Sequence, residues 1–525
     1  MEGTVVNAVS GEPVKKAHLS LRPAGAPNGV PYGTDTDGAG HFLFDGVDPG
    51  RYTLSISRTG FVNQQYSPQG NSRQSSPIEL AAGQKLKQLT VKLTPQGVLS
   101  GRVLDEEGEP LANANVQCMV FGYQRGKKQL MGRNGTSTDD RGEFRLHGLS
   151  PGKYILSVAY RPPGVTERAA SRLPGPEAAE PGYATTFYPN ATSPDNASSL
   201  EITPGAQVNG ITFTLARVRT VIVAGHINGK PSNRNTNLML LPRNNVGFGM
   251  DGMMRAGGRV DARGMFQIRG VTPGSYLLRA DYNDESGRYS ARMPIEVGNS
   301  NIDGIELTMQ PPGEVHGRVI VEENGDLAGA ALNVNLQPKS TGPGMGGAGA
   351  QAKDDLTFQV RNVTPDPYDV RVGGLPDGFY LKSIRMGQQD VTESGVDFTQ
   401  GVSAEDMTIV VNPNGGQIDG SVQNSNGETA AGAMVTLIPE ESHRSTLWLY
   451  KTANSDQNGH FTIKGVRPGK YTVYAWEDIE SGAYQDPDYV KPHESAGEKV
   501  SIDAGAHQNV QLKSIPAEKN DKTSR

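Results

Sequence analysis

The sequence predicts an all-β protein built of about five tandem β-sandwich modules, and three observations lead to this prediction. One motif recurs five times along the 525 residues. Segments with alternating apolar and polar residues precede and follow the copies, which is typical of strands with one buried face. The 66 glycines and 35 prolines favour turns and disfavour long helices.

The repeating unit has the length of a small domain. Four clear copies of the motif cover residues 36–54, 138–156, 260–278 and 455–473, and a degenerate copy covers residues 353–370. Repeats spaced this widely are folded domains rather than turns of a solenoid. We therefore expect modules at residues 1–95, 96–216, 217–310, 311–412 and 413–516, of which the fourth is degenerate.

Three stretches depart from the regular pattern. An insertion rich in Pro, Ala and Ser interrupts the second module at residues 161–199. Loops rich in Met and Gly occupy residues 244–258 and 341–350. The charged tail, residues 517–525, is expected to be disordered.

Each module is expected to use the same series of elements. A strand led by glycine and a turn come first, and a second alternating strand follows, as at residues 17–21 and 433–437. The motif then opens with an aspartate, whose carboxylate accepts hydrogen bonds from backbone amides while a glycine closes the loop with a positive φ. A phenylalanine points inward, a Pro-Gly pair forms a type II turn, a tyrosine begins the next strand, and another alternating strand ends the module.

These motif positions are filled in the same order in the four clear copies. They are Asp37, Phe42, Pro49, Gly50 and Tyr52; Asp139, Phe144, Pro151, Gly152 and Tyr154; Asp261, Phe266, Pro273, Gly274 and Tyr276; and Asp456, Phe461, Pro468, Gly469 and Tyr471. In the degenerate fourth module Asp366 replaces the turn glycine, so we expect that turn to differ.

The pattern T-D-x-x-G-x-F-x-[IL]-x-G-[VL]-x-P-G-x-Y-x-[LV] resembles the carboxypeptidase regulatory-like domain family. The resemblance implies immunoglobulin/transthyretin-like β-sandwiches, related in fold to Cna-B-type and carbohydrate-binding modules. With the flanking strands it covers most of residues 1–515. It implies accessory or binding modules of bacterial proteins that are secreted, periplasmic or on the outer surface, and it does not imply peptidase activity.

Composition excludes several classes of protein. The net charge of -6 and the absence of a Lys/Arg run argue against a nucleic-acid partner. No stretch approaches the roughly 18 apolar residues of a transmembrane helix. Cys118 is the only cysteine, so no disulfide forms within the chain, and we expect it to be a buried strand residue. No signal peptide precedes the first expected strand at residues 3–6, which suggests a mature or truncated chain, so export is expected from the family resemblance alone.

The motifs of the common enzyme classes are missing. A zinc carboxypeptidase needs a His-x-x-Glu pair, and none of the nine histidines has a glutamate at that spacing. P-loop, serine-elbow and dinucleotide motifs are also absent. The aspartate loops, with pairs such as Asp139 and Asp140, offer oxygen ligands of the kind calcium prefers, but each has only one or two, so stabilisation of the turn is the favoured interpretation. We therefore expect no cofactor and no catalysis.

One segment of the fifth module carries the only local hypothesis of binding. Residues 471–494 gather aromatic and acidic side chains, and Trp448 and Tyr450 are candidates to join them. Aromatic faces stack on sugar rings, and carboxylates accept hydrogen bonds from sugar hydroxyls. The candidate sugar-binding residues are Trp476, Tyr474, Tyr484, Tyr489, Asp478 and Glu480. The alternative interpretation is that Trp476 caps the core of the sandwich while the acids keep a loop soluble.

Three functions are compatible with these features. The leading hypothesis is a non-catalytic exported or cell-surface protein that binds a ligand, with a polysaccharide or a cell-envelope protein as partner. Carbohydrate is favoured by analogy of fold alone, and fold does not determine function. The alternatives are a structural spacer or adhesion stalk, and an accessory portion of a larger enzyme such as a carboxypeptidase. The sequence does not predict the oligomeric state.

Overall fold

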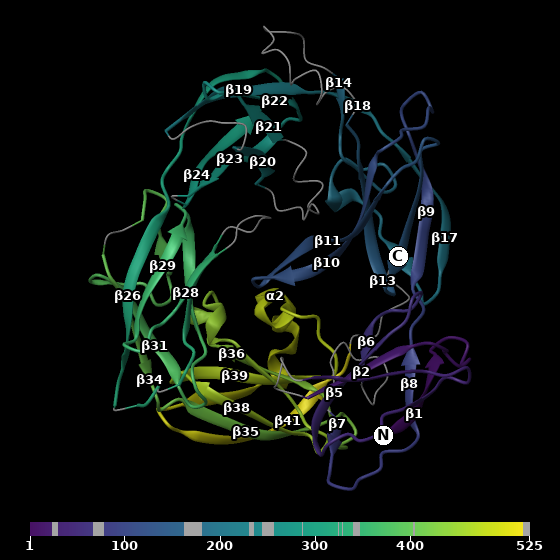
Figure 1. The fold of residues 1–525 in the computed structure, drawn as a ribbon, viewed down its shortest axis with the longest axis vertical. Coiled ribbons are helices and arrows are strands. Elements are labelled where there is room, and N and C mark those ends of the chain that lie inside the picture. Colours follow the sequence, from purple (N-terminus) through teal and green to yellow (C-terminus); the bar gives the residue numbers. More distant parts are fainter. Residues whose placement is uncertain are drawn as a thin grey trace.

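The computed structural model of the protein describes residues 1–23, 30–66, 78–161, 181–229, 236–243, 257–285, 287–323, 325–327, 329–339, 347–402 and 405–517. Nearly all regular structure in these residues is β-strand, arranged as successive sheets along the chain (Figure 1). The predicted all-β class with tandem sandwich modules is therefore confirmed. Most of the insertion and of the two Met/Gly-rich loops, and nearly all of the tail, fall at residues 162–180, 244–256, 341–346 and 518–525, which lie outside the described residues. The described ends of the two loops are strand rather than loop, because residues 257–258 begin β21 (Gly257–Val260) and residues 348–350 belong to β28 (Ala348–Gln351).

The first module sets the topology that the others repeat. In its first sheet β1 (Glu2–Asn7) pairs antiparallel with β4 (His41–Leu43) and parallel with β8 (Leu89–Leu93). In its second sheet β2 (His18–Pro23) lies between β3 (Tyr32–Asp35) and β5 (Gly50–Ser57), and β5 also pairs with β6 (Gln64–Gln65) and β7 (Ile78–Leu80). The alternating burial of β5 places Tyr52, Leu54 and Ile56 in the core between the sheets.

The second module has the same order with longer strands. Its first sheet contains β12 (Glu143–Leu149), β9 (Gly97–Leu104) and β17 (Gln207–Thr214); its second contains β11 (Lys127–Ser137), β10 (Asn115–Gln124), β13 (Gly152–Ala159) and β15 (Thr186–Phe187), with β16 (Leu200–Ile202) also paired to β13. The remaining elements are η2 (Pro194–Asn196) and a small sheet of β14 (Pro181–Tyr183) and β18 (Arg217–Arg219). Because β18 lies beyond residue 216, pairing with the second module crosses the expected boundary.

The third and fourth modules keep this order despite changes at their edges. The third is one seven-stranded sheet of β24 (Gly287–Val297), β23 (Gly274–Asp284), β20 (Asn237–Pro242), β21 (Gly257–Val260), β22 (Met265–Val271), β19 (Val221–Asn228) and β25 (Ile302–Thr308), because β21 pairs with both β20 and β22. The fourth has one sheet of β29 (Thr357–Val363), β26 (Gly313–Val321), β34 (Met407–Asn412), β31 (Tyr380–Met386) and β32 (Gln389–Asp390), and one of β28 (Ala348–Gln351), β27 (Asn333–Pro338), β30 (Pro367–Gly373) and β33 (Val396–Asp397).

The fifth module adds short helices to the common sandwich. Its strands run β37 (Lys451–Asn454), β36 (Met434–Pro439), β39 (Gly469–Trp476), β41 (His507–Ile515), β35 (Gly416–Gln423) and β38 (His460–Val466), with β40 (Glu498–Ile502) paired to β39. The helices are η4 (Glu441–His443), η5 (Leu447–Leu449), η6 (Ala483–Gln485), α2 (Pro487–Val490) and η7 (Lys491–Ala496). No helix in the described part of the chain is long and apolar enough to cross a membrane.

The motif aspartates act as predicted, as acceptors for backbone amides. One carboxylate oxygen of Asp37 accepts from the amides of Ala39 and His41, each at 2.9 Å. Asp139, Asp261 and Asp456 make the same two contacts at 2.8–3.0 Å. The glycines that close these loops have φ between +70° and +86°, where a side chain is disfavoured. The carboxylate oxygen that faces the loop is therefore already occupied by the turn.

The hydroxyl residue before the aspartate has a role that the sequence reasoning missed. Thr138 is 3% exposed; its Oγ1 accepts from the amide of Ala114 at 2.8 Å and donates to the carbonyl of Leu111 at 2.5 Å. Thr36 and Ser455 repeat both contacts in the first and fifth modules. The third module has Val260 at this position. The Thr or Ser that precedes the aspartate in the first, second and fifth modules was the available signal.

The motif tyrosines bind back across the Pro-Gly turn. In all five modules the phenol donates to the carbonyl four residues earlier, at 2.6–2.9 Å, as Tyr471 does to Arg467. The predicted type II turn is wrong. Gly152, Gly274 and Gly469 have φ of +154°, +159° and +158°, nearly extended, whereas a type II turn needs about +80°. The left-handed glycine instead stands four residues earlier, for example Gly465 at φ +62°.

The glycine of each first strand allows the closing strand to approach. A Cβ placed on Gly420 would lie 2.3 Å from the carbonyl oxygen of Val510 and 2.7 Å from the ring of Phe461. Gly3, Gly101, Gly225 and Gly317 would each meet the closing strand's carbonyl oxygen at 2.0–2.4 Å. Since a real Cβ does not come this close to backbone, these positions require glycine.

Gly420→Ala is expected to destabilise the fifth module by about 1–3 kcal/mol, because the strand pair must separate to admit the methyl group. Both tryptophans of the chain, Trp448 and Trp476, lie in this module, so denaturant unfolding followed by tryptophan fluorescence reports on it. Ser421→Ala, the next residue of β35, is the matched control and should leave the midpoint nearly unchanged. An unchanged midpoint for Gly420→Ala would contradict the packing described here.

Cys118 is buried, as expected. It is 0% exposed on β10 within the core of the second module. Burial raises the pKa of its thiol to about 12, so the group is protonated and unreactive in the folded protein at neutral pH.

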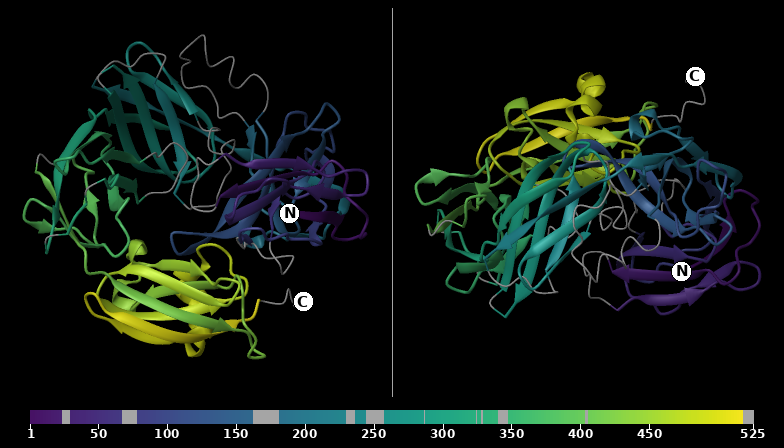
Figure 2. Two further views of the ribbon diagram at one scale, coloured as in Figure 1. Left: turned by 60° about the horizontal axis from the view of Figure 1, so that its bottom comes forward. Right: turned by 90° about the horizontal axis from the view of Figure 1, so that it is seen from above.

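The modules follow a curved path rather than a straight line. Figures 1 and 2 show the second to fifth modules placed around a ring, with the hairpin of β10 and β11 reaching inward to α2. The first module lies to one side of this ring (Figure 2).

Candidate functional site

The aromatic residues of the predicted sugar site are brought together, but they face inward. Trp476 and Tyr474 are each 1% exposed and stack with ring centroids 5.7 Å apart. The indole nitrogen of Trp476 donates to Thr436 at 3.0 Å. Tyr489 is half-buried and lies 5.8 Å from Trp476, and Tyr484 is half-buried beside Tyr450 at 6.2 Å.

This burial corrects the prediction of an exposed stacking platform. The helices η6, α2 and η7 fold over β39 and, with neighbouring residues, form a second small core around Trp476. The cause is an additional layer of chain that alternation along a strand does not reveal. Trp476 therefore has the core-capping role of the alternative interpretation, and neither Trp476 nor Tyr474 presents a ring face to a ligand.

The acidic residues of the segment are placed around this second core. Asp478 and Glu480 are half-buried, and Asp478 Oδ1 is enclosed with no hydrogen-bond partner among the residues that the structure describes. Asp486 caps α2 by accepting from the amide of Asp488 at 2.9 Å. The helix cap gives at least one of these acids a structural role.

The hairpin of β10 and β11, called here the clasp hairpin, covers the same core from the second module. The ring of Tyr123 lies 5.7 Å from that of Tyr489 in an edge-to-face arrangement. The backbones approach closely, because a Cβ on Gly126 would lie 2.6 Å from the carbonyl oxygen of Gln485. The tip turns tightly through Arg125 at φ +54° and Gly126 at φ +71°.

The clasp hairpin also binds the fourth module. The guanidinium of Arg125 forms an ion pair with Asp369 and donates to the carbonyl of Pro338 at 3.0 Å. Lys339 reaches the same carboxylate at 3.7 Å. One hairpin therefore links the second, fourth and fifth modules and closes the ring seen in Figure 1.

The unusual turn of the fourth module is explained by its neighbour. Asp366, which replaces the turn glycine, is 5% exposed and forms an ion pair with Arg292 of the third module. The substitution thus supplies a buried contact at this junction. The sequence shows that Asp366 departs from the motif, but it does not identify Arg292 as the residue that pairs with it.

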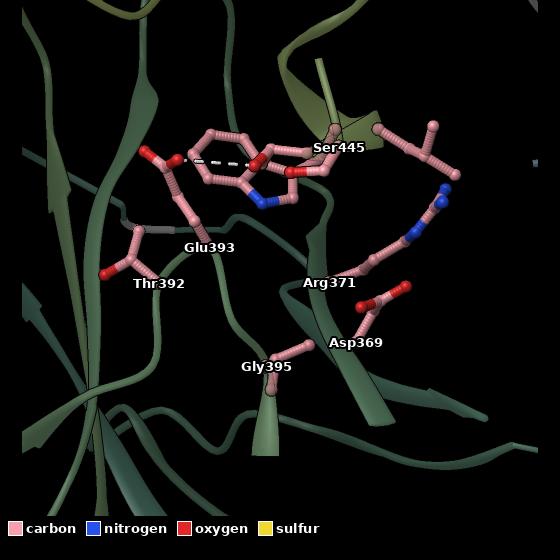
Figure 3. A pocket seen from close by; sticks show the side chains of 10 residues that line it. Asp369, Arg371, Thr392, Glu393, Gly395 and Ser445 are labelled. Atoms are coloured by element: carbon pink, nitrogen blue, oxygen red, sulfur yellow. Dashed lines mark hydrogen bonds between the residues drawn. The ribbon is translucent and has the colours of Figure 1, made fainter. Parts of the chain in front are cut away.

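The fourth and fifth modules are joined by charged groups around Glu393. Its carboxylate accepts from His443 at 2.7 Å and from Arg467 at 3.2 Å. Trp448 packs partly against the core of the fourth module, with Arg467 5.5 Å from its ring centroid. Figure 3 shows this junction, where Glu393 and Arg371 approach the loop that carries Ser445.

A cavity of about 570 Å³ lies at the same junction. Residues between 371 and 381 border it from the fourth module, and Trp448, Tyr450 and Tyr484 border it from the fifth. Gln485 of the fifth module also borders it and contacts the clasp hairpin. Burial raises the pKa of Tyr450 to about 12, so its hydroxyl stays a donor, here to the carbonyl of Arg444 at 3.0 Å. A shallower hollow of about 620 Å³ lies between the first and second modules.

The described residues contain no group of three or more His, Cys, Asp or Glu side chains that could hold a metal ion. The motif residues stabilise turns and pack within each module. The features that do not repeat, such as the ion pairs of Arg125, Arg292 and Arg467, lie at the junctions between modules. Fold and site together define a protein of tandem regulatory-type β-sandwich modules.

The model of the carboxypeptidase regulatory-like domain matches residues 1–94, 98–216 and 417–512, more than half of the chain, and the chain belongs to this family. Residues 217–416 lie outside the matched regions, yet their strands have the same order and their tyrosines make the same bond across the turn. No match was found among curated proteins.

Similar solved structures include two pilins and one further bacterial protein. A streptococcal ancillary pilin is 11% identical, covering 57% of this chain and 100% of its own, with a TM-score of 0.20. The Bacillus anthracis TIE protein is 11% identical, and the match covers 95% of this chain and 68% of the TIE chain, with a TM-score of 0.16. A minor pilin of Streptococcus agalactiae is 13% identical, and the match covers 41% of this chain and 96% of the pilin chain, with a TM-score of 0.21. These values are too low to support a statement about function.

Proposed function

We propose that this chain is a non-catalytic, exported protein that binds a ligand, with carbohydrate as the favoured class. The observation that supports the proposal is the cavity between the fourth and fifth modules, whose volume of about 570 Å³ lies within the range of small-molecule sites, about 300–1,000 Å³. Aromatic and hydrogen-bonding side chains border it, as binding of sugar requires. Membership of a family of regulatory-like domains supports an accessory rather than a catalytic role.

A structural role is the second candidate. Ion pairs at the junctions, such as Arg292 with Asp366 and Arg467 with Glu393, favour a fixed arrangement of modules. The clasp hairpin, however, turns the chain back on itself, which shortens the reach that a stalk needs. Binding is therefore the better supported function.

Affinity electrophoresis of the full chain in gels that contain neutral or acidic polysaccharides tests the proposal. We expect at least one polysaccharide to retard the protein relative to a non-binding control protein. If no polysaccharide in the panel retards it, carbohydrate binding is contradicted and the structural role becomes the better explanation.

A further inference from the structure

The cavity at the junction of the fourth and fifth modules is lined by more basic than acidic side chains. Arg371, Lys451, Lys464 and Arg467 border it, whereas Asp377 is the one acidic residue among the side chains that line it. The chain as a whole has a net charge of -6, so this excess runs against the overall composition. Positive groups collected in a cleft attract and orient an anionic ligand.

Two of these cations already have acidic partners. Lys464 lies 3.0 Å from Asp377, and Arg467 lies 3.2 Å from Glu393. The ammonium of Lys451 donates only to the carbonyl of Lys464, at 2.9 Å, among the contacts that the structure describes. Burial lowers the pKa of Lys451, with Asp377 opposing the shift, as expected for a charge that is incompletely compensated.

Arg371 is the least compensated cation of the cavity. It has no hydrogen bond or ion pair to any described residue, although it is half-buried on β30. Its neighbour on the strand, Asp369, is engaged by Arg125 and approached by Lys339. Figure 3 draws a smaller pocket that shares Arg371 and Trp448 with this cavity, and it shows Arg371 extending from β30 toward the loop of the fifth module that carries Ser445. Partial burial also lowers the pKa of Arg371, and a half-buried guanidinium without a partner gains from pairing with a carboxylate.

The other side of the cavity suits a sugar ring. Tyr450 and Tyr484 lie with ring centroids 6.2 Å apart, and Trp448 holds Arg467 against its face. Tyr450 is buried and the face of Trp448 is covered by Arg467, so the half-buried ring of Tyr484 supplies the aromatic surface, and the neighbouring cations supply donors for a carboxylate and for hydroxyl oxygens. Neutral sugars would leave Arg371 unpaired, whereas an acidic sugar would pair it.

We infer that this cavity binds a carboxylated sugar, such as a unit of a uronic-acid polysaccharide, with Arg371 and Lys451 as the groups that hold the carboxylate. The inference rests on the proposed function, because it assigns that function to a particular site and to acidic rather than neutral carbohydrate. Arg371 supplies the paired donors that a carboxylate accepts, and Lys451 supplies a second charge.

Calorimetric titration of the full chain with trigalacturonic acid and, separately, with neutral galactotriose tests this inference. We expect the acidic trimer to bind and the neutral trimer not to bind. Arg371→Gln should weaken binding about tenfold or more, because a hydrogen-bonded charge pair is lost. Lys451→Met should weaken it in the same direction. Arg361→Gln, an exposed arginine of the same module paired with Glu314 at 3.7 Å, is the matched control and should bind as the wild type does.

The outcomes separate this inference from the proposed function. Equal binding of both trimers, or acidic binding that neither substitution weakens, would overturn the inference and leave carbohydrate binding in place. If neither trimer binds while a polysaccharide gel still retards the protein, the cavity is not the site. If nothing binds in either experiment, both proposals fail. Tryptophan fluorescence unfolding of each variant establishes that it is folded.

Discussion

Trp476→Ala is expected to destabilise the fifth module by about 3–5 kcal/mol, the usual cost of removing a large buried aromatic side chain. The indole is 1% exposed, and its removal would also leave the buried hydroxyl of Thr436 without its donor. The measurement is denaturant unfolding followed by the fluorescence of the remaining tryptophan, Trp448, which lies in the same module. The transition should move to a much lower denaturant concentration.

Trp448→Phe is the matched comparison for this substitution. Trp448 is half-buried at the junction with the fourth module, so its replacement should cost less than that of Trp476. A Trp476→Ala protein with unchanged stability and abolished sugar binding would instead restore the platform hypothesis. The two outcomes for Trp476→Ala are distinct, because a core role predicts unfolding at a lower denaturant concentration, whereas a platform role predicts a loss of binding with stability unchanged.

Removing the anchors of the clasp hairpin is expected to open the ring of modules. Tyr123→Ala together with Arg125→Ala eliminates the contact with Tyr489 and the ion pair with Asp369, at a cost of about 2–4 kcal/mol to the closed arrangement. Small-angle X-ray scattering should show a larger radius of gyration, and backbone amides near α2 should exchange hydrogen faster. Both changes follow from separation of the second module from the fourth and fifth.

Lys127→Ala provides the control for the clasp, because Lys127 is exposed on the same hairpin. It should leave the scattering profile unchanged. A double variant with the same radius of gyration as the wild type would mean that the junctions alone hold the ring closed, and the role assigned to the hairpin would be wrong.

The local rules of the fold could be predicted from sequence because they repeat. Asp456 accepts two amides of one loop and Tyr471 bonds across one turn, and the motif spacing encodes such short-range tasks. Phe461 alternates into the core of its module, as the strand pattern predicts. The same reasoning gave the wrong turn type. The Pro-Gly pair fits a type II turn by composition, but the tyrosine hydrogen bond and the left-handed Gly465 set the observed geometry.

The candidate site could be predicted only in part, because it depends on contacts between distant segments. The aromatic segment was identified, but the cover over Trp476 comes from later helices and from a hairpin more than 300 residues away in sequence. Asp366 was recognised as a departure from the motif, whereas Arg292 could not be identified as its partner. Pairing of charges across module junctions depends on how the modules are oriented, and one sequence does not specify that.

The parallel pairing of the first and last strands of a module has a mechanical consequence. In the first, second and fifth modules, β1 with β8, β9 with β17 and β35 with β41 are hydrogen-bonded neighbours that run in the same direction. Tension applied through the chain ends therefore pulls the two strands along their length in opposite directions, and the bonds between them are loaded together in shear rather than opened one by one. The side-chain anchors of the clasp hairpin lie outside these ladders and would yield first, so the ring would extend under load while the modules remain folded.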